Sequence, residues 1–493
     1  MASLTVHPME IRCTEARPVL AALPSRRAAK FILSNYIGRV HMWWPILHLP
    51  SLRNGYDKIF TEPNRCDAFQ KFVVFITLAL GSFEGRKTMD RAMPPDIFTP
   101  SDYFATSSRF YAEMRSRRTL QALQATLLIC LWLMRTPTAS ASEDLWQLSR
   151  FAISSAQAMG CHRNHPRRDI DASERELRSR IWWCSYALER TIAVALGRTL
   201  SLRNQAIDTP YPRNNADDAL TDEEAKYASA FKSMGIIPAV HLFRLTRILG
   251  DTLESVYIAR PRVRPSLSLK ATRQVSEDIR TELRRWEQEI DLYTPIGSRE
   301  NKELRIRHSL ASLLLNRPSP SFPLPAQENM QACLSASSTA ITLWTELLDE
   351  KELKITWNLF HDVFISGLSW LYCGWRTTSM DDETIIANAR SCLRILEHTC
   401  NEAGYSRRHL GLFDKLTRIT IATRQLRQEA PNMSSMTESN VPMDVDLDGS
   451  LDQLLSNLDW SYGRQDNEAT DPWMSAFISD IEKLHQEISR QPQ

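Results

Sequence analysis

The stretch that decides the fold prediction runs from Glu174 to Arg198, ERELRSRIWWCSYALERTIAVALGR. Its apolar residues recur at spacings of three or four, at Leu177, Ile181, Cys184, Leu188, Ile192 and Ala195. This spacing places them on one face of an α-helix of about six turns. Gly197 follows where such a helix would end, because glycine adopts the left-handed conformation at little cost. The stretch therefore predicts a long helix with one buried face.

The same helical period dominates from about residue 25 to about residue 428. It predicts helices near residues 27–40, 66–82, 101–114, 119–135, 141–159, 174–196, 222–235, 238–258, 268–292, 304–315, 326–349, 355–375, 382–403 and 408–428. Ser140 with Glu143, and Thr221 with Glu224, have the spacing of capping boxes. Residues 41–52, HMWWPILHLPSL, form an apolar segment broken by prolines. No alternating β-branched run is long enough for a strand, so the predicted fold class is all-α.

Composition excludes several classes of protein. Glycine accounts for 15 of 493 residues, well below the ~7% of an average chain, which argues against glycine-rich phosphate loops. Lys and Arg total 60 against 58 Asp and Glu, a net charge of +2, which does not support a nucleic-acid coat or a membrane-surface protein. The longest apolar runs, Phe72–Leu80 and Thr126–Met134, are about half of the ~20 residues that span a membrane. With no N-terminal signal sequence, we expect an intracellular protein without a membrane partner.

Cysteine usage indicates buried thiols and not a metal centre. The nine cysteines contain no C-x-x-C pair and most lie in apolar runs, which predicts free thiols in a reducing compartment. Cys161, His162 and His165 form the one compact Cys/His group. A structural zinc site needs a second close pair of ligands, and none lies at a usable spacing. We predict no metal and no cofactor.

Catalytic motifs are missing as well. The chain has no G-x-S-x-G, H-E-x-x-H, G-x-x-x-x-G-K-[ST] or G-x-G-x-x-G pattern, so we predict that it is not an enzyme. Basic residues cluster at Arg163, Arg167, Arg168, Arg175, Arg178 and Arg180. Acidic residues are interleaved with them, which is typical of a solvated helix face and not of a phosphate-binding stripe. Direct contact of this chain with DNA stays open.

The chain's end differs in composition from the helical body. Residues 431–460 contain no Lys or Arg, and within them acids alternate with apolar residues. The candidate activation segment consists of Asp444, Asp446, Leu447, Asp448, Leu451, Leu454, Leu455, Leu458 and Trp460. Such a segment can fold as an amphipathic helix in a partner's groove. The alternatives are a disordered tail without a partner and a helix that docks back on the body. A last helix is predicted near residues 474–488.

Taken in order, the motifs of residues 146–212 resemble the core of the fungal-specific transcription factor domain, also called the middle homology region. The matching positions are Trp146, Gly160, His162, Arg163, Arg178, Arg180, Trp182, Trp183, Tyr186, Arg190, Gly197 and Arg198. Three mild departures are Cys161 for Leu, Glu189 for Asp and Thr199 for Pro. The resemblance extends over roughly residues 25–425. The aromatic residues are large apolar groups with one polar atom each, and Arg190 and Arg198 lie near a helix end. We expect these residues to tie two helices and a loop together; an effector pocket is the alternative.

The resemblance implies a nuclear regulator of transcription. Its expected parts are a disordered lead (residues 1–24), an α-helical regulatory domain (residues 25–428) and an acidic–apolar tail (residues 429–493). Members of the family control metabolic pathways, often gene clusters for secondary metabolites. The body would transmit an inducer or partner signal, and the tail would recruit the transcription machinery or a coactivator. Two competitors are a metabolite sensor or corepressor without activation function, and an unrelated all-α enzyme.

Family members usually have a zinc cluster before this domain, with six cysteines that include two C-x-x-C pairs. Here Cys13 and Cys66 are the only cysteines before residue 130. Either the chain is a lone regulatory domain, or a first exon that encodes the cluster is absent from this sequence. A chain without its own DNA reader could act by pairing with a DNA-binding partner or as a homodimer.

Overall fold

The computed structural model describes residues 20–429, apart from 90–96, 115–118, 136–140, 165–169, 215–218, 259–264, 320, 323–324, 378–379 and 404–407. Within these residues the regular secondary structure is entirely helical: sixteen α-helices with short 3₁₀ and π segments and no strand. This confirms the all-α prediction. The described residues fall into two compact units, one within Met1–Ile129 and Asn214–Ile236, the other within Cys130–Arg213 and Ile237–Gln493.

Unit 1 is built around one apolar helix. Its elements are α1 (Arg26–Tyr36), a π-helical turn (Ile37–His41), α2 (Leu49–Thr61), α3 (Ala68–Met89), α4 (Pro100–Met114), most of α5 (Leu120–Leu133), α8 (Asp222–Tyr227) and α9 (Ser229–Met234). Helix α3 packs against α1, α2 and α4. The backbones of α1 and α3 touch, because a Cβ at Gly81 would lie 2.3 Å from the Ile32 carbonyl oxygen. Residues 68–85 are long and apolar enough to cross a membrane by length and composition, but 67% of them are buried in the fold, as in a soluble core helix.

In unit 1 one helix was not predicted and one prediction was wrong. The proline-broken segment of residues 41–52 contains the start of α2, with Pro50 in its first turn. Proline is tolerated there because the first N–H groups of a helix have no partner inside the helix. The predicted helix over residues 222–235 is two helices, which break at Ala228. The Cβ of Ala228 would lie 3.1 Å from a Cβ at Gly38, so close packing against the π-helical turn coincides with this break.

Local sequence signals set the ends of the segment from Asn214 to Ile236. The predicted capping box of Thr221 and Glu224 is confirmed at α8, and Glu224 also pairs with Arg53 at 2.8 Å. At the far end Gly235 adopts a left-handed φ of 56°. The Asn214 Oδ1 atom accepts a 2.8 Å hydrogen bond from the Ile236 N–H, so this side chain joins the two ends of the segment.

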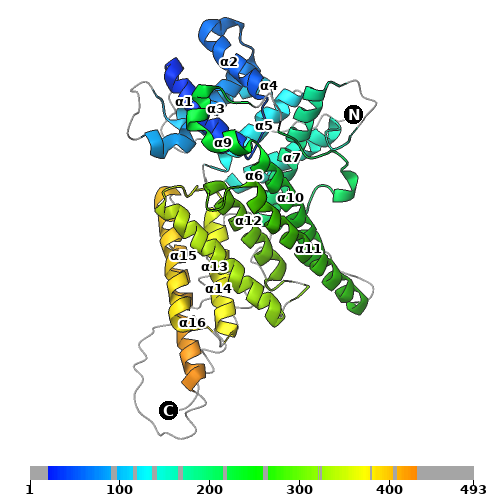
Figure 1. The fold of residues 1–493 in the computed structure, drawn as a ribbon, viewed down its shortest axis with the longest axis vertical. Coiled ribbons are helices and arrows are strands. Elements are labelled where there is room, and N and C mark those ends of the chain that lie inside the picture. The colour runs from blue at the N-terminus through cyan, green and yellow to red at the C-terminus, as the bar shows by residue number, and fades with distance from the viewer. Residues whose placement is uncertain are drawn as a thin grey trace. The chain divides into compact units, whose positions relative to one another are not determined.

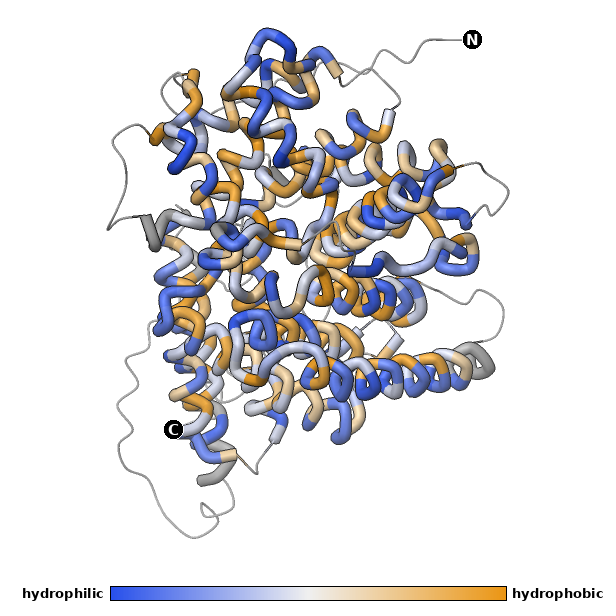
Figure 2. The backbone as a smooth tube through the Cα atoms, turned by 45° about the horizontal axis from the view of Figure 1, so that its top comes forward, coloured by the Kyte–Doolittle hydropathy of each residue, from blue (hydrophilic) through white to orange (hydrophobic). Residues whose placement is uncertain are grey.

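Unit 2 contains the remaining helices: α6 (Ala141–Ala158), α7 (Ala172–Ala195), α10 (Ile237–Thr252) with a π-helical end (Leu253–Ile258), α11 (Pro265–Tyr293), α12 (Arg299–Asn316), α13 (Gln327–Asp349), α14 (Leu359–Arg376), α15 (Asp382–Ala403) and α16 (Arg408–Glu429). Helix α7 packs against α6 and α10. Helix α12 contacts α10 and α11 as well as α13, and so joins the α7 region to the C-terminal helices (Figure 1). Hydrophobic and hydrophilic residues alternate along the helical tubes, as the period predicts (Figure 2).

The C-terminal bundle, α13 to α16, has an apolar core with α14 at its centre. Every residue of α14 from Val363 to Trp375 is buried. Gly367 lets α16 approach, since a Cβ there would lie 2.5 Å from the Phe413 ring. Near the end of α16 the buried Arg424 donates hydrogen bonds to the carbonyls of Gly374, Thr377 and Met380 and to the Asp382 carboxylate. One arginine thus anchors the last helix to the connection between α14 and α15.

Eight of the nine cysteines lie in the described residues, and all eight are buried free thiols, as predicted. The three-part division of the chain stays a prediction. The candidate activation segment and the helix expected near residues 474–488 lie outside the described residues, as do the predicted lead up to residue 19, Ser140 of the first capping box, and His165.

Candidate functional site: a strap held by helix α7

Helix α7 is buried more completely than its apolar pattern predicts. It begins at Asp171, whose side chain accepts a 2.6 Å hydrogen bond from the Glu174 N–H. Its last residue is Ala195, and Gly197 just beyond it has the predicted left-handed φ of 62°. Every residue from Ser179 to Arg190 is buried, so the prediction of a single buried face was wrong. The polar face is covered by residues 198–213, which we call the strap.

The C-terminal end of the strap lies on the first half of α7. The Pro210 carbonyl accepts hydrogen bonds from the Ser179 hydroxyl at 2.7 Å and from the Trp183 indole N–H at 2.9 Å. Arg180 donates to the Arg213 carbonyl at 3.1 Å. Glu176, which also pairs with Arg180 at 3.0 Å, accepts from the Arg213 N–H at 3.0 Å. Side chains of α7 thus supply partners to strap backbone that has no secondary structure of its own.

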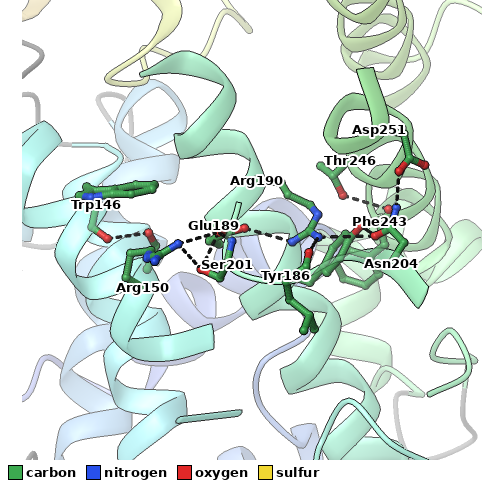
Figure 3. A network of polar contacts seen from close by, with 12 residues as sticks. Trp146, Arg150, Tyr186, Glu189, Arg190, Ser201, Asn204, Phe243, Thr246 and Asp251 are labelled. Atoms are coloured by element: carbon green, nitrogen blue, oxygen red, sulfur yellow. Dashed lines mark hydrogen bonds and ion pairs between the residues drawn. The ribbon is translucent and has the colours of Figure 1, made fainter. Parts of the chain in front are cut away.

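The N-terminal end of the strap lies on the second half of α7 (Figure 3). Glu189 accepts hydrogen bonds from the Ser201 N–H at 2.7 Å and from the Ser201 hydroxyl at 2.8 Å. Arg190 donates to the Leu202 carbonyl at 2.6 Å. Tyr186 donates to the Asn204 Oδ1 atom at 2.5 Å. Because strap residue numbers fall as α7 numbers rise, the strap runs antiparallel to the helix.

The centre of this network is a buried ion pair between adjacent residues. Arg190 Nη1 lies 3.1 Å from Glu189 Oε2, and the two side chains are 1% and 0% exposed. The Arg190 guanidinium also stacks on the Tyr186 ring at 3.5 Å. Gly250 of α10 makes room for it, since a Cβ there would lie 3.1 Å from Arg190 Nε. Burying two charges is costly unless each is also hydrogen-bonded, and the strap supplies those hydrogen bonds.

Helix α10 also contacts the strap. The Asn204 amide donates to Asp251 at 2.7 Å. Burial raises the pKa of the Asp251 carboxyl, although Arg247 opposes that shift. Burial likewise raises the pKa of the Tyr186 hydroxyl and of the Cys184 thiol. Raised pKa values keep the tyrosine and the cysteine neutral at physiological pH, as suits structural groups better than nucleophiles.

The segment after α6 holds the middle of the strap. Gly160 ends α6 with a left-handed φ of 72°, as predicted. The His162 carbonyl then accepts hydrogen bonds from the N–H groups of Asp208 and Thr209, at 3.2 and 3.3 Å. Arg163 lies 3.5 Å from the Asp208 carboxylate. The His162 ring packs on Trp182, 5.4 Å between ring centres. His162, which belongs to the compact Cys/His group considered for metal binding, therefore contacts the strap and the core.

The remaining predicted residues support the two ends of the arrangement. Two guanidinium groups lie against the Trp146 ring, that of Arg150 at 5.2 Å and that of Arg198 at 5.0 Å from its centre. Arg178 pairs with Glu174 at 2.9 Å and donates to the Met159 carbonyl at 3.3 Å, which ties α7 to the end of α6. The structure thus brings many of the predicted positions together around one strap. Among the described residues no group of three His, Cys, Asp or Glu side chains could hold a metal ion.

Several residues of this site were not among the predicted ones. They are Arg150, Glu176, Ser179, Glu189, Ser201, Asn204, Gly250 and Asp251. Glu176 and Glu189 lie inside the family motif. They were not predicted as site residues because a carboxylate on a helix usually forms an exposed ion pair. The adjacent charges of Glu189 and Arg190, within an otherwise apolar part of the helix, were the sequence signal for a buried ion pair. The strap residues gave none, because their partners lie on other elements.

Comparison with known proteins identifies the class. The profile of the fungal-specific transcription factor domain family matches residues 33–288, about half of the chain, and the chain belongs to this family. This is a family of fungal transcription factors and not of enzymes.

Three relatives share about a quarter of their aligned residues with this chain. The pyrimidine pathway regulatory protein 1 of Saccharomyces cerevisiae is 24% identical over 57% of this chain and 32% of its own length. The positive regulator of purine utilization of Emericella nidulans is 22% identical over 83% of this chain and 48% of its own. An uncharacterized transcriptional regulatory protein of Schizosaccharomyces pombe is 25% identical over 63% of this chain and 39% of its own. The matches thus cover less than half the length of these relatives.

Proposed function

We propose that this chain controls the expression of the genes of one metabolic pathway, with the helical body as its regulatory part. The observation that supports this most is the strap site, because four positions of the family motif donate hydrogen bonds to the strap: Arg180, Trp183, Tyr186 and Arg190. Two relatives bear names that refer to pyrimidine and purine pathways. The pathway we favour is a secondary-metabolite gene cluster, as expected from the sequence.

The pathway is identified by comparing transcripts of a strain that lacks the gene with those of its parent. We expect a small set of clustered biosynthetic genes to change by several-fold. A strain that carries the Arg190→Met variant in place of the wild-type gene should show changed transcript levels for the same genes if the α7–strap site is needed for function. Change confined to primary metabolism would contradict the secondary-metabolite assignment, and no change in any pathway would contradict the function itself.

We further propose that the tail activates transcription by binding a coactivator or the transcription machinery. Its acidic and apolar residues alternate from Asp444 to Trp460 without a Lys or Arg, which suits an amphipathic helix in a partner's groove. Residues 431–493 fused to a heterologous DNA-binding domain should raise reporter output. The matched control replaces Leu451, Leu454, Leu455 and Leu458 with Ala and keeps every acid. No output from the first fusion would favour a sensor or corepressor, and equal raised output from both would mean that the four leucines are not needed for activation.

Nuclear location and partner choice belong to the same proposal. A fluorescent fusion of the full chain should concentrate in the nucleus. Affinity purification from nuclei should recover a DNA-binding protein of the zinc-cluster type, or a second copy of this chain. A purely cytoplasmic signal under inducing and non-inducing conditions would contradict the proposal.

A further inference from the structure

The end of the strap has the chemistry of a proline-rich peptide ligand. Its sequence from Thr209 to Pro212 is Thr-Pro-Tyr-Pro. Each proline fixes its own φ near −65°, and each residue before a proline is pushed toward the extended region. No helix or strand is assigned from residue 207 to residue 214. The segment is therefore extended for local reasons, before any contact with α7.

The surface under this segment has the features that recognise such peptides. Proline-rich segments in general dock on aromatic grooves and expose unpaired carbonyls to donors in the groove. Here the indole N–H of Trp183 and the hydroxyl of Ser179 both donate to the Pro210 carbonyl. The Tyr211 ring stacks on Trp183, with 4.2 Å between centroids and 30° between planes. Phe243 supports Trp183 at 6.3 Å on a near-parallel plane.

The contacts beyond the prolines are made to main-chain atoms. Glu176 accepts from the Arg213 N–H and Arg180 donates to the Arg213 carbonyl. Since these two groups belong to one residue, the pair fixes the direction and register of an extended peptide without reading its side chain. The hydrogen bonds to Pro210 and Arg213 would therefore be available to any segment with this backbone. Only the stacking on Trp183 depends on a side chain, the Tyr211 ring.

We propose that the face of α7 formed by Glu176, Ser179, Arg180 and Trp183 is a peptide-binding site. Residues 209–213 occupy it as an internal ligand, and a proline-rich, extended segment of a partner protein binds there in exchange. Because of the internal ligand, the apparent affinity for the partner equals the intrinsic affinity multiplied by the fraction of molecules whose site is free.

The test uses the full chain and a labelled peptide, Asp-Thr-Pro-Tyr-Pro-Arg, the sequence of residues 208–213. Binding is followed by fluorescence anisotropy. Tyr211→Ala weakens the internal ligand without changing the groove, so this variant should bind the peptide at least ~10-fold more tightly than the wild-type chain. A peptide with alanine in place of both prolines should bind at least ~10-fold more weakly, because its extended form must be ordered on binding.

Two further variants make the result decisive. Adding Trp183→Phe to Tyr211→Ala removes the indole donor and keeps a ring, and the gain in affinity should disappear. Arg284→Ala, on an exposed α11 residue whose side chain is 61% accessible, should bind as the wild type does. Pro212→Ala is a second way to weaken the strap if Tyr211→Ala misfolds. If neither strap variant, folded by circular dichroism, binds the peptide more tightly than the wild type, the site serves the strap alone and the proposal is wrong.

Discussion

Helices α7 and α14 are both buried along most of their length, but by opposite means. In α7 the buried residues include Arg180, Glu189 and Arg190, and these hold a strap that is irregular apart from a 3₁₀ turn at Asn204–Ala206. In α14 the buried residues from Val363 to Trp375 are mainly apolar and face the other helices of the bundle. The difference shows what buried polar groups are for in this protein. A helix can be covered by other helices through apolar packing alone, whereas an irregular segment needs partners for its own N–H and C=O groups.

The largest expected effect on stability comes from removing the buried cation, Arg190, which tests how far the α7 site depends on buried charge. Arg190→Met leaves the buried Glu189 with only the more distant Arg150, 3.8 Å away, as a cationic partner, and we expect the free energy of unfolding to fall by about 3–5 kcal/mol. Urea unfolding followed by circular dichroism measures it. Adding Glu189→Gln to the same chain should recover part of the loss, because the buried charge is then gone. A loss below ~1 kcal/mol for Arg190→Met would mean that the pair is not desolvated as the structure has it.

A comparable truncation in the bundle should behave differently. Leu371 of α14 is fully buried, and Leu371→Ala should cost about 2–5 kcal/mol through lost apolar contact and a cavity. Hydrogen exchange separates the two mechanisms. Arg190→Met should speed exchange at Ser201 and Arg213 relative to the rest of the chain, whereas Leu371→Ala should not. Equal loosening of the strap in both variants would break the comparison.

The α7–α10 region should also differ from the bundle in its response to acid. Burial, with a contribution from Arg244, lowers the pKa of His241 to about 4, against ~6.5 in an unfolded chain. The unfolded chain therefore binds more protons between these values, and stability present above pH 6.5 is lost as the pH falls toward 4.

The matched variant for the acid response is His241→Leu, which cannot be protonated. It should lose about 1–3 kcal/mol less than the wild type between pH 7 and pH 4. The measurement is urea unfolding at a series of pH values, with Leu371→Ala expected to keep the wild-type slope. An unchanged slope in His241→Leu would show that this imidazole does not titrate on unfolding.

The smallest expected effects come from two helical glycines. A Cβ at Gly250 would lie 3.1 Å from Arg190 Nε and 3.2 Å from Leu200 Cδ1, whereas nothing lies within 4 Å of one at Gly411. Gly250→Ala should therefore destabilise by about 1–3 kcal/mol through overpacking. Gly411→Ala should stabilise by about 0.5–1 kcal/mol, because alanine loses less conformational freedom on forming a helix. Thermal unfolding of both variants checks the signs, and a stabilising Gly250→Ala would place Arg190 elsewhere.

Sequence by itself determined the helices and where many of them end. The three-to-four spacing of apolar residues predicted α7, α10 and α13 closely, and Gly160 and Gly197 end their helices in the predicted left-handed conformation. These features depend on residues near each other in the chain, where steric preference and apolar period act directly. The family motif could likewise be recognised from order and spacing alone.

Only the tertiary structure decided what the motif does. Glu189 and Arg190 on a helix suggest solvent, and their burial follows from a strap that arrives from residues 201 to 204 and from a glycine at 250. The role of Trp183 was also decided by the fold. The sequence shows only a large aromatic residue, and the structure shows that its indole N–H donates to the Pro210 carbonyl. Such roles arise from the free energy of satisfying buried polar groups, and that quantity exists only once distant segments have been brought together.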